Sequence, residues 1–220
     1  MIQKLLAMLF LFTGSCVYAQ SNSVGQSDPD AKVILDRVSA KFKTYKSVVL
    51  SFTLKIENAS GKVMGTKKGT VYMKGSRYRV SVADQEIYSD GTNIWTYDKS
   101  TNEVQITKFD PTANTITPEK MFTDFYDKDF LYKLNGTVKQ GSRLLQEIEL
   151  TPLDKTKSFF KVIVEVDKKT QNIASTKIFQ KTGDRYTYAI TGLQPDVAIP
   201  DSKLVFNAKD YPGVDVVDLR

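Results

Sequence analysis

The chain has 220 residues, and its 31 Lys and Arg residues outnumber 25 Asp and Glu residues, which gives a formal net charge of +6. It contains no histidine and a single cysteine, Cys16. The lack of histidine excludes Ser-His and Cys-His nucleophile pairs and histidine-containing zinc sites. The mild basicity could attract a membrane surface or an acidic partner, although an ordinary solvated surface explains it better.

The N-terminus has the pattern of a secretory signal peptide. Lys4 precedes an apolar run over 5–12, which is too short to cross a bilayer as a helix, and Val17-Tyr18-Ala19 is an A-x-A-like end. We expect cleavage after Ala19, so that 1–19 is the signal peptide and 20–220 is one domain of 201 residues (220 − 19). A chain of that length can bury a full core without a second domain.

Cys16 allows a competing interpretation, in which lipid is attached to the cysteine and tethers the protein to a membrane. Thr13 argues against it, because such a signal usually carries an aliphatic residue at that position. With Cys16 removed, the mature chain has no disulfide and no thiol, so its stability depends on packing.

The first predicted element of the mature chain is an amphipathic helix over about 29–46. Asp28 suits its N-cap, and Pro29 suits the first helical position, where the missing N–H costs nothing. Apolar residues recur at helical spacing after it (Ile34, Leu35, Val38, Phe42, Tyr45). Considered alone, this stripe indicates an ordinary core-facing helix.

The period then changes to two, which predicts β-strands with one apolar and one mostly polar face. Leu50, Phe52 and Leu54 alternate with polar residues in the first strand. After the turn at Gly75-Ser76, Tyr78 and Val80 do the same in the third strand.

The stretch 86–108 holds three short β runs and the only tryptophan, Trp95. Asp90-Gly91 is a strong hairpin signal, because glycine reaches positive φ at little steric cost and aspartate tolerates it. Ile94-Trp95-Thr96-Tyr97 leaves this turn, and a polar turn at 98–102 sends the chain back. The stretch therefore predicts a meander of antiparallel strands.

The alternation breaks between 108 and 136. Thr117-Pro118 predicts a helix start, and Phe122 and Phe125 belong to an aromatic-rich stripe on a short, weakly helical segment. Such a segment owes its structure to the surface on which it rests, as a mobile cover does. Strands resume after it, and the whole pattern predicts an α+β fold: a curled, mostly antiparallel sheet or incomplete barrel of about ten strands with helices in its mouth.

Two other classes of function have weaker support. Paired carboxylates could in principle serve a small glycosidase-like enzyme (Glu147 with Glu149, or Asp124 with Asp127 and Asp129), but alternating carboxylates on a strand are more often a solvated edge. Basic residues interleaved with tyrosines could form a nucleic-acid platform, against which export argues (Lys67, Lys68, Lys74, Arg77, Arg79, Tyr72, Tyr78). We expect no catalytic residue, no metal site and no cofactor.

The motif Tyr88-Ser89-Asp90-Gly91, followed after two residues by Ile94-Trp95 and then by Tyr97 and Glu103-Val104, resembles the central hairpin of the LolA family of periplasmic lipoprotein carriers. The resemblance extends loosely over most of the mature chain. It includes the helix that runs into the first strand, the strand over 69–74 with its Tyr-x-Val successor, the proline-started helical segment, and the ending. That ending, Pro-Gly-Val-x-Val-Val-Asp-Leu-Arg, resembles the Bacteroidetes branch of the family.

The resemblance implies a half-open β-barrel closed by helices, with an apolar cavity for the acyl chains of lipoproteins. The implied protein is a non-enzymatic, monomeric periplasmic carrier, without metal or cofactor. It takes acylated lipoproteins from an inner-membrane ABC transporter and passes them to an outer-membrane acceptor. The alternative is a lipid-anchored acceptor, or an envelope-stress sensor or scaffold module, with the same half-barrel. Lipid on Cys16 would favour the acceptor.

The candidate cavity residues come from the predicted sheet and its cover: Leu50, Phe52, Leu54, Tyr78, Val80, Trp95, Tyr97, Phe122 and Phe125. For each of them plain core packing is an equally good explanation, because alternation does not distinguish a filled interior from an empty one.

LolA-like carriers often have an arginine at the end of the second strand that ties down the covering helices. Here that position is Lys74, and Arg77 and Arg79 follow it, so these three are the candidates for a lid latch. Lysine lacks the planar donor fork of arginine, which predicts a looser lid.

Overall fold

The computed structural model describes residues 25–110, 118, 122–123 and 125–220. The predicted signal peptide (1–19), its cleavage site and Cys16 lie outside the described residues, as do Thr117 and Asp124. The predictions for these residues therefore stay predictions.

A single twelve-stranded sheet, open along two edges, forms the body of the molecule. Its strand order is β12-β6-β5-β4-β3-β2-β1-β11-β10-β9-β8-β7, and every described pairing is antiparallel except that of β12 with β6. The strands are β1 (Val48–Glu57), β2 (Val63–Lys74), β3 (Arg77–Val82), β4 (Gln85–Ser89), β5 (Asn93–Asp98), β6 (Glu103–Lys108), β7 (Phe130–Gln140), β8 (Arg143–Pro152), β9 (Phe159–Asp167), β10 (Ile173–Gln180), β11 (Arg185–Pro195) and β12 (Asp215–Asp218).

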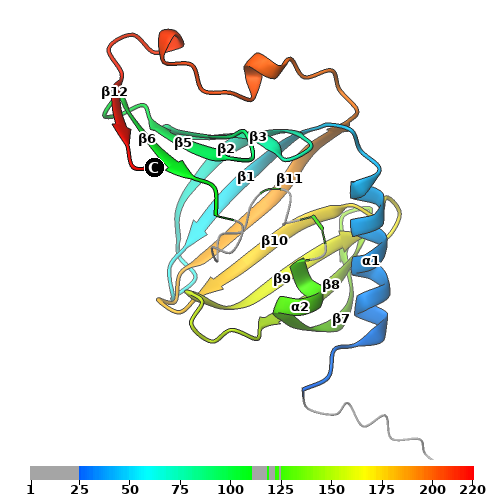
Figure 1. Ribbon diagram of the computed structural model, residues 1–220. Coiled ribbons are helices and arrows are strands. Elements are labelled where there is room, and N and C mark those ends of the chain that lie inside the picture. The colour runs from blue at the N-terminus through cyan, green and yellow to red at the C-terminus, as the bar shows by residue number, and fades with distance from the viewer. Residues whose placement is uncertain (1–24, 111–117, 119–121, 124) are drawn as a thin grey trace, which may run out of the picture.

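The sheet curls, and two helices lie on its concave side (Figure 1). These are α1 (Pro29–Lys43) and the short α2 (Phe125–Asp129), whereas two 3-10 turns, η1 (Asp201–Lys203) and η2 (Ala208–Asp210), lie in the C-terminal segment. The predicted α+β fold with a curled, unclosed antiparallel sheet is confirmed, with twelve strands instead of about ten.

Asp28 starts α1 and also fixes it to the sheet. One carboxylate oxygen of Asp28 accepts a hydrogen bond from the Asp30 backbone N–H (2.9 Å), and the other accepts one from the Leu134 N–H of β7 (3.1 Å). The backbone N–H of Asp28 donates to the Tyr132 carbonyl at 2.9 Å. The helix therefore enters along the β7 edge and buries its apolar stripe against the concave side of the sheet, with Ile34, Leu35 and Val38 inward.

Strand register separates two apolar clusters on opposite faces, since directly paired residues of antiparallel strands share a face. On the concave face, Leu50 pairs with Val71 and Val71 pairs with Val80, and these residues join the main core around α1. Within the described residues, a second cluster lies on the convex face and consists of Tyr88, Tyr97, Val104 and Phe206.

Gly69 leaves space for an aromatic ring in the main core. It pairs with Phe52, and a Cβ atom at position 69 would lie 2.2 Å from that ring. We expect Gly69→Ala to lower the free energy of unfolding by about 1–3 kcal/mol in urea titrations, because the displaced ring must enter a packed interior. Gly65→Ala on the same strand is the control, since its Cβ would meet no atom within 4 Å. Equal stability of the two variants would contradict the steric explanation.

Candidate functional site

We call α1, α2 and residues 122–123 before α2 the helical cover. It occupies the half of the concave face that belongs to β7–β10 (Figure 1). The ring of Phe122 stacks on that of Phe42 in α1, with centroids 4.6 Å apart and planes 9° apart. The Tyr126 hydroxyl in α2 donates to the Asp36 carboxylate in α1 at 2.7 Å. This stacking contact, this hydrogen bond and an ion pair between Lys32 and Asp127 (3.2 Å) therefore connect the short aromatic segment to the N-terminal helix.

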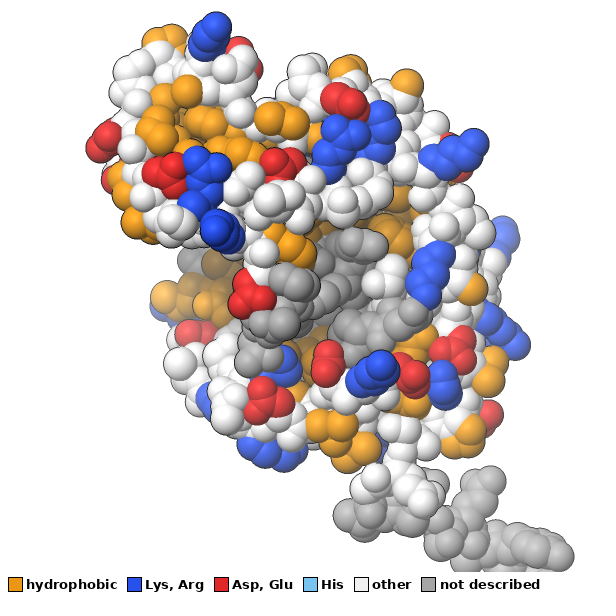
Figure 2. Space-filling view, viewed as in Figure 1, with side chains coloured by type: hydrophobic (Ala, Val, Ile, Leu, Met, Phe, Trp, Pro, Cys, Tyr) orange, Lys and Arg blue, Asp and Glu red, His pale blue; other side chains and the backbone are white. Residues whose placement is uncertain are grey.

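A band of apolar side chains on the same concave face stays partly exposed, and we call it the apolar band. It crosses the sheet from β4 to β10: Leu54, Val80, Val82, Ile87, Ile178, Tyr188 and Ile190. Register places its members side by side, since Leu54 pairs with Tyr188 and Val80 pairs with Ile87. Figure 2 shows hydrophobic side chains at the margins of the hollow between the upper and lower parts of the molecule.

The surroundings of the apolar band are those of a low-polarity site. Burial raises the pKa of the Tyr188 hydroxyl above its ordinary value. Its centroid lies 5.8 Å from that of Phe52. Lys67 on β2, which pairs with Leu54, is exposed and lies beside the band on the same face. Such a surface suits hydrocarbon and offers few partners to a polar ligand.

Six of the predicted cavity residues share the concave face. Four are buried in the main core, namely Leu50, Phe52, Tyr78 and Phe122. Leu54 and Val80 are partly exposed and belong to the apolar band. Phe125 begins α2, but its side chain lies outside the described part of the chain.

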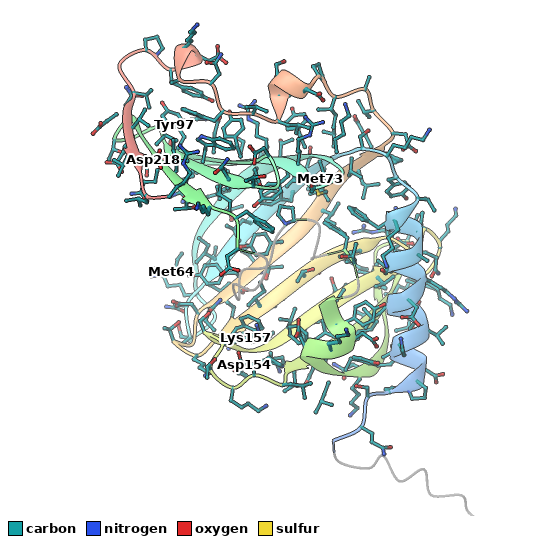
Figure 3. All side chains as sticks on the ribbon, viewed as in Figure 1. Met64, Met73, Tyr97, Asp154, Lys157 and Asp218 are labelled. Atoms are coloured by element: carbon teal, nitrogen blue, oxygen red, sulfur yellow. The ribbon has the colours of Figure 1, made fainter. Side chains whose placement is uncertain are left out.

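Trp95 and Tyr97 are not brought together with the other candidates. In the β4–β5 pairing Trp95 lies opposite Tyr88, and Tyr97 lies opposite Glu86, on the convex face. The Tyr97 ring contacts Tyr211 of the C-terminal segment with centroids 4.3 Å apart. Figure 3 shows Tyr97 on the side of the sheet that this segment covers.

The three latch candidates also lie on the convex face, away from the helical cover. The Lys74 ammonium and the Arg77 guanidinium both contact the Asp201 carboxylate, at 2.8 and 3.3 Å. Arg79 contacts the Glu86 carboxylate at 2.9 Å. Alternation could have indicated this placement, because these residues are out of phase with the inward-facing Met73, Tyr78 and Val80.

Sequence reasoning missed a polar centre at Glu86, which is only 5% exposed. One of its carboxylate oxygens accepts hydrogen bonds from Tyr88 (2.7 Å), Tyr211 (2.8 Å) and Arg79 (2.9 Å), and the other lies 2.9 Å from Lys99. Burial alone raises the pKa of this carboxyl, but the hydrogen bonds and the charge of Arg79 outweigh it and hold the pKa at about 2. The resulting Glu86 network ties the C-terminal segment to β4.

Neither a metal centre nor a membrane-spanning helix is found in the described part of the chain. Across 25–110 and 125–220, no three His, Cys, Asp or Glu side chains are grouped so that they could hold a metal ion. In the same ranges, no helix is both long enough and apolar enough to cross a bilayer.

The family of this chain follows from its sequence match to known proteins. Residues 43–207 match the family described as outer membrane lipoprotein carrier protein LolA, so the chain belongs to the LolA family and the predicted resemblance is confirmed. The outer-membrane lipoprotein carrier protein of Cupriavidus necator is 27% identical over 146 residues, which cover 64% of this chain and 66% of that relative. The chain thus spans slightly less than two thirds of this relative's length.

Solved structures share the architecture at low sequence identity. An uncharacterized conserved protein from Thermus thermophilus superimposes with a TM-score of 0.58 and 12% identity, covering 86% of this chain and 99% of the other. The lipoprotein LppX of Mycobacterium tuberculosis gives a TM-score of 0.51 and 13% identity, covering 79% and 100%. At such identities the likeness concerns the fold alone.

Proposed function

We propose that the protein is a non-enzymatic periplasmic carrier that holds the acyl chains of lipoproteins against its concave face. It receives them from an inner-membrane ABC transporter and delivers them to an outer-membrane acceptor. The observation that carries the proposal is the partly exposed apolar band in a member of the LolA family. The carrier acts as a monomer. It needs no cofactor, because transfer breaks no covalent bond.

Physical chemistry supports the need for such a surface. Each methylene group removed from water stabilises a complex by about 0.8 kcal/mol, so a multiply acylated protein leaves a membrane slowly without a binding partner. The apolar band offers side chains from several adjacent strands, among them Leu54, Val80 and Ile190, on the face opposite the Glu86 network. Transient binding on an open face also allows release at the destination.

The decisive experiment is isolation of the protein from the periplasm, followed by mass spectrometry of whatever is bound. Acylated lipoproteins in stoichiometric amounts are expected. Their release from membranes by added purified protein is the functional counterpart. Material that contains no acyl chain, from cells that are actively making lipoproteins, would reject the carrier function.

A polar substitution in the apolar band tests which face binds. Val80→Asn is expected to weaken binding of a fluorescent fatty acid roughly tenfold, because the amide loses water without gaining a partner. Ser81→Asn is the matched control, since it lies next to Val80 on β3 and faces the convex side. Affinity is measured by fluorescence titration after circular dichroism has shown that both variants are folded. Equal losses for both would place the ligand elsewhere.

A further inference from the structure

Three hairpin tips meet at one end of the sheet, and we call residues 58–64, 153–160 and 181–185 the tip surface. The Arg185 guanidinium donates to the Ala59 carbonyl at 3.4 Å, which joins the β10–β11 tip to the β1–β2 tip. The Lys181 backbone N–H donates to the Ser158 carbonyl at 2.8 Å, which joins it to the β8–β9 loop. Figure 3 shows Met64, Asp154 and Lys157 toward the same side of the molecule, away from α1.

The tip surface combines basic and apolar side chains. Five basic residues (Lys62, Lys155, Lys157, Lys181, Arg185) exceed two acidic residues (Asp154, Asp184), which gives a formal charge of +3 (5 − 2). Four large apolar side chains are half exposed or more: Val63 (50%), Met64 (62%), Leu153 (50%) and Phe160 (50%). Figure 2 shows hydrophobic, basic and acidic side chains interspersed along the lower left of the molecule. This composition suits the interface between lipid headgroups and acyl chains.

Composition alone does not distinguish this end of the sheet from the opposite end. The opposite end, around 138–144 and 167–170, also carries lysines and two exposed apolar residues, Val138 (46%) and Leu144 (47%). There, however, the end of α1 reaches the β9–β10 turn, where the Lys41 ammonium donates a hydrogen bond to the Thr170 carbonyl.

A gradient of burial along β1 distinguishes the two ends. The inward side chains begin fully buried, at 2% exposed for Val48 and 3% for Leu50, and rise to 7% for Phe52. Leu54 and Ile56, nearest the tips, are partly exposed. The apolar band therefore opens toward the tip surface and is closed at the other end.

We propose that the tip surface docks on an anionic lipid bilayer and holds the open end of the apolar band against the membrane. Lysines supply attraction to anionic headgroups, and Val63 and Met64 enter the boundary between headgroups and acyl chains. An acyl chain can then pass between bilayer and protein with little exposure to water. This inference rests on the proposed carrier function, which gives the docking its purpose.

The test is co-sedimentation of the purified protein with vesicles of phosphatidylcholine alone or mixed with phosphatidylglycerol. Binding only to the anionic vesicles, weakened by added salt, is expected. The triple variant Lys62→Gln, Lys155→Gln, Lys181→Gln should lose on the order of 100-fold in affinity at low salt, because each basic residue near such a surface contributes about fivefold. The matched variant Lys139→Gln, Lys168→Gln, Lys169→Gln removes the same charge from the opposite end and should lose much less.

An apolar pair tests the second half of the proposal. Val63→Ser with Met64→Ser should weaken binding to anionic vesicles, whereas Val138→Ser with Leu144→Ser should leave it nearly unchanged. Equal losses from the two ends, equal binding to neutral vesicles, or no vesicle binding at all would overturn the docking proposal.

Fatty-acid binding is measured separately on the same variants. Loss of vesicle binding with intact fatty-acid binding is the expected result for the tip variants. Failure of the unmodified protein to bind fatty acid would reject the carrier function alone.

Discussion

Glu86→Ala is expected to lower the free energy of unfolding by about 3–5 kcal/mol, since removing one member of a buried charge pair leaves its partners unpaired. Arg79, Tyr88 and Tyr211 all donate to the Glu86 carboxylate, and Tyr88 is only 3% exposed. Urea unfolding followed by circular dichroism measures the effect. Glu103→Ala, which removes a partly exposed carboxylate from β6, is the control and should change stability by less than about 1 kcal/mol, the usual limit for surface interactions.

The same carboxylate makes a specific contribution to acid sensitivity. The pKa of Glu86 is about 2 in the folded protein and 4.5 ordinarily, so its ionised form stabilises the fold above pH 4.5. This stabilisation falls progressively as the pH drops from 4.5 toward 2. The stability difference between the unmodified protein and Glu86→Gln should therefore shrink over that interval. A difference that stays constant there would show that folding does not lower the pKa of Glu86.

Phe206→Ala should have the second large effect. It is expected to lower the free energy of unfolding by about 3–5 kcal/mol, because it removes a buried aromatic side chain. Phe206 is 9% exposed, stacks on Tyr211 at 4.9 Å and meets Tyr88 edge-on at 5.8 Å. Trp95 packs partly buried against this cluster, so its fluorescence emission should shift to longer wavelength as water enters. Unfolding in urea and emission spectra provide the two measurements.

A neighbouring substitution controls for the second prediction. Val205→Ala removes methyl groups from a side chain that is 39% exposed, and it should cost only about 0.5 kcal/mol without moving the Trp95 emission. Phe206 and Glu86 both contact Tyr211. The double variant Glu86→Ala, Phe206→Ala should therefore lose less stability than the sum of the two single losses. Strict additivity would mean that the two residues fix the C-terminal segment independently.

Local patterns predicted the elements well where one physical cause dominates. Asp28-Pro29 located the start of α1, and Asp28 does cap it. The helix ends at Lys43, a little earlier than the predicted boundary at about 46, because the Thr44 hydroxyl and N–H both bond the Lys41 carbonyl. Alternation correctly grouped Leu50 with Phe52, whose side chains face the same core.

The candidate site was predicted only in part, because alternation shows which residues share a face of a strand but not which face of the sheet that is. Trp95 and Tyr97 share a face, yet the register through β4 turns it away from the concave side. Glu86 could not be identified either, since its partner Tyr211 lies 125 residues further along the chain. Contacts at such separations follow from the topology and leave no local pattern.

The position of β1 in the middle of the sheet has a consequence for how the molecule is made. This strand lies between β2 and β11, so its second edge is completed only by residues near the end of the chain, and β6 pairs with the terminal β12. A chain in which β11 has not yet paired with β1 therefore carries an unpaired strand edge next to an apolar face. We therefore expect slow folding, because the central strand β1 pairs with a strand that is far away in the sequence.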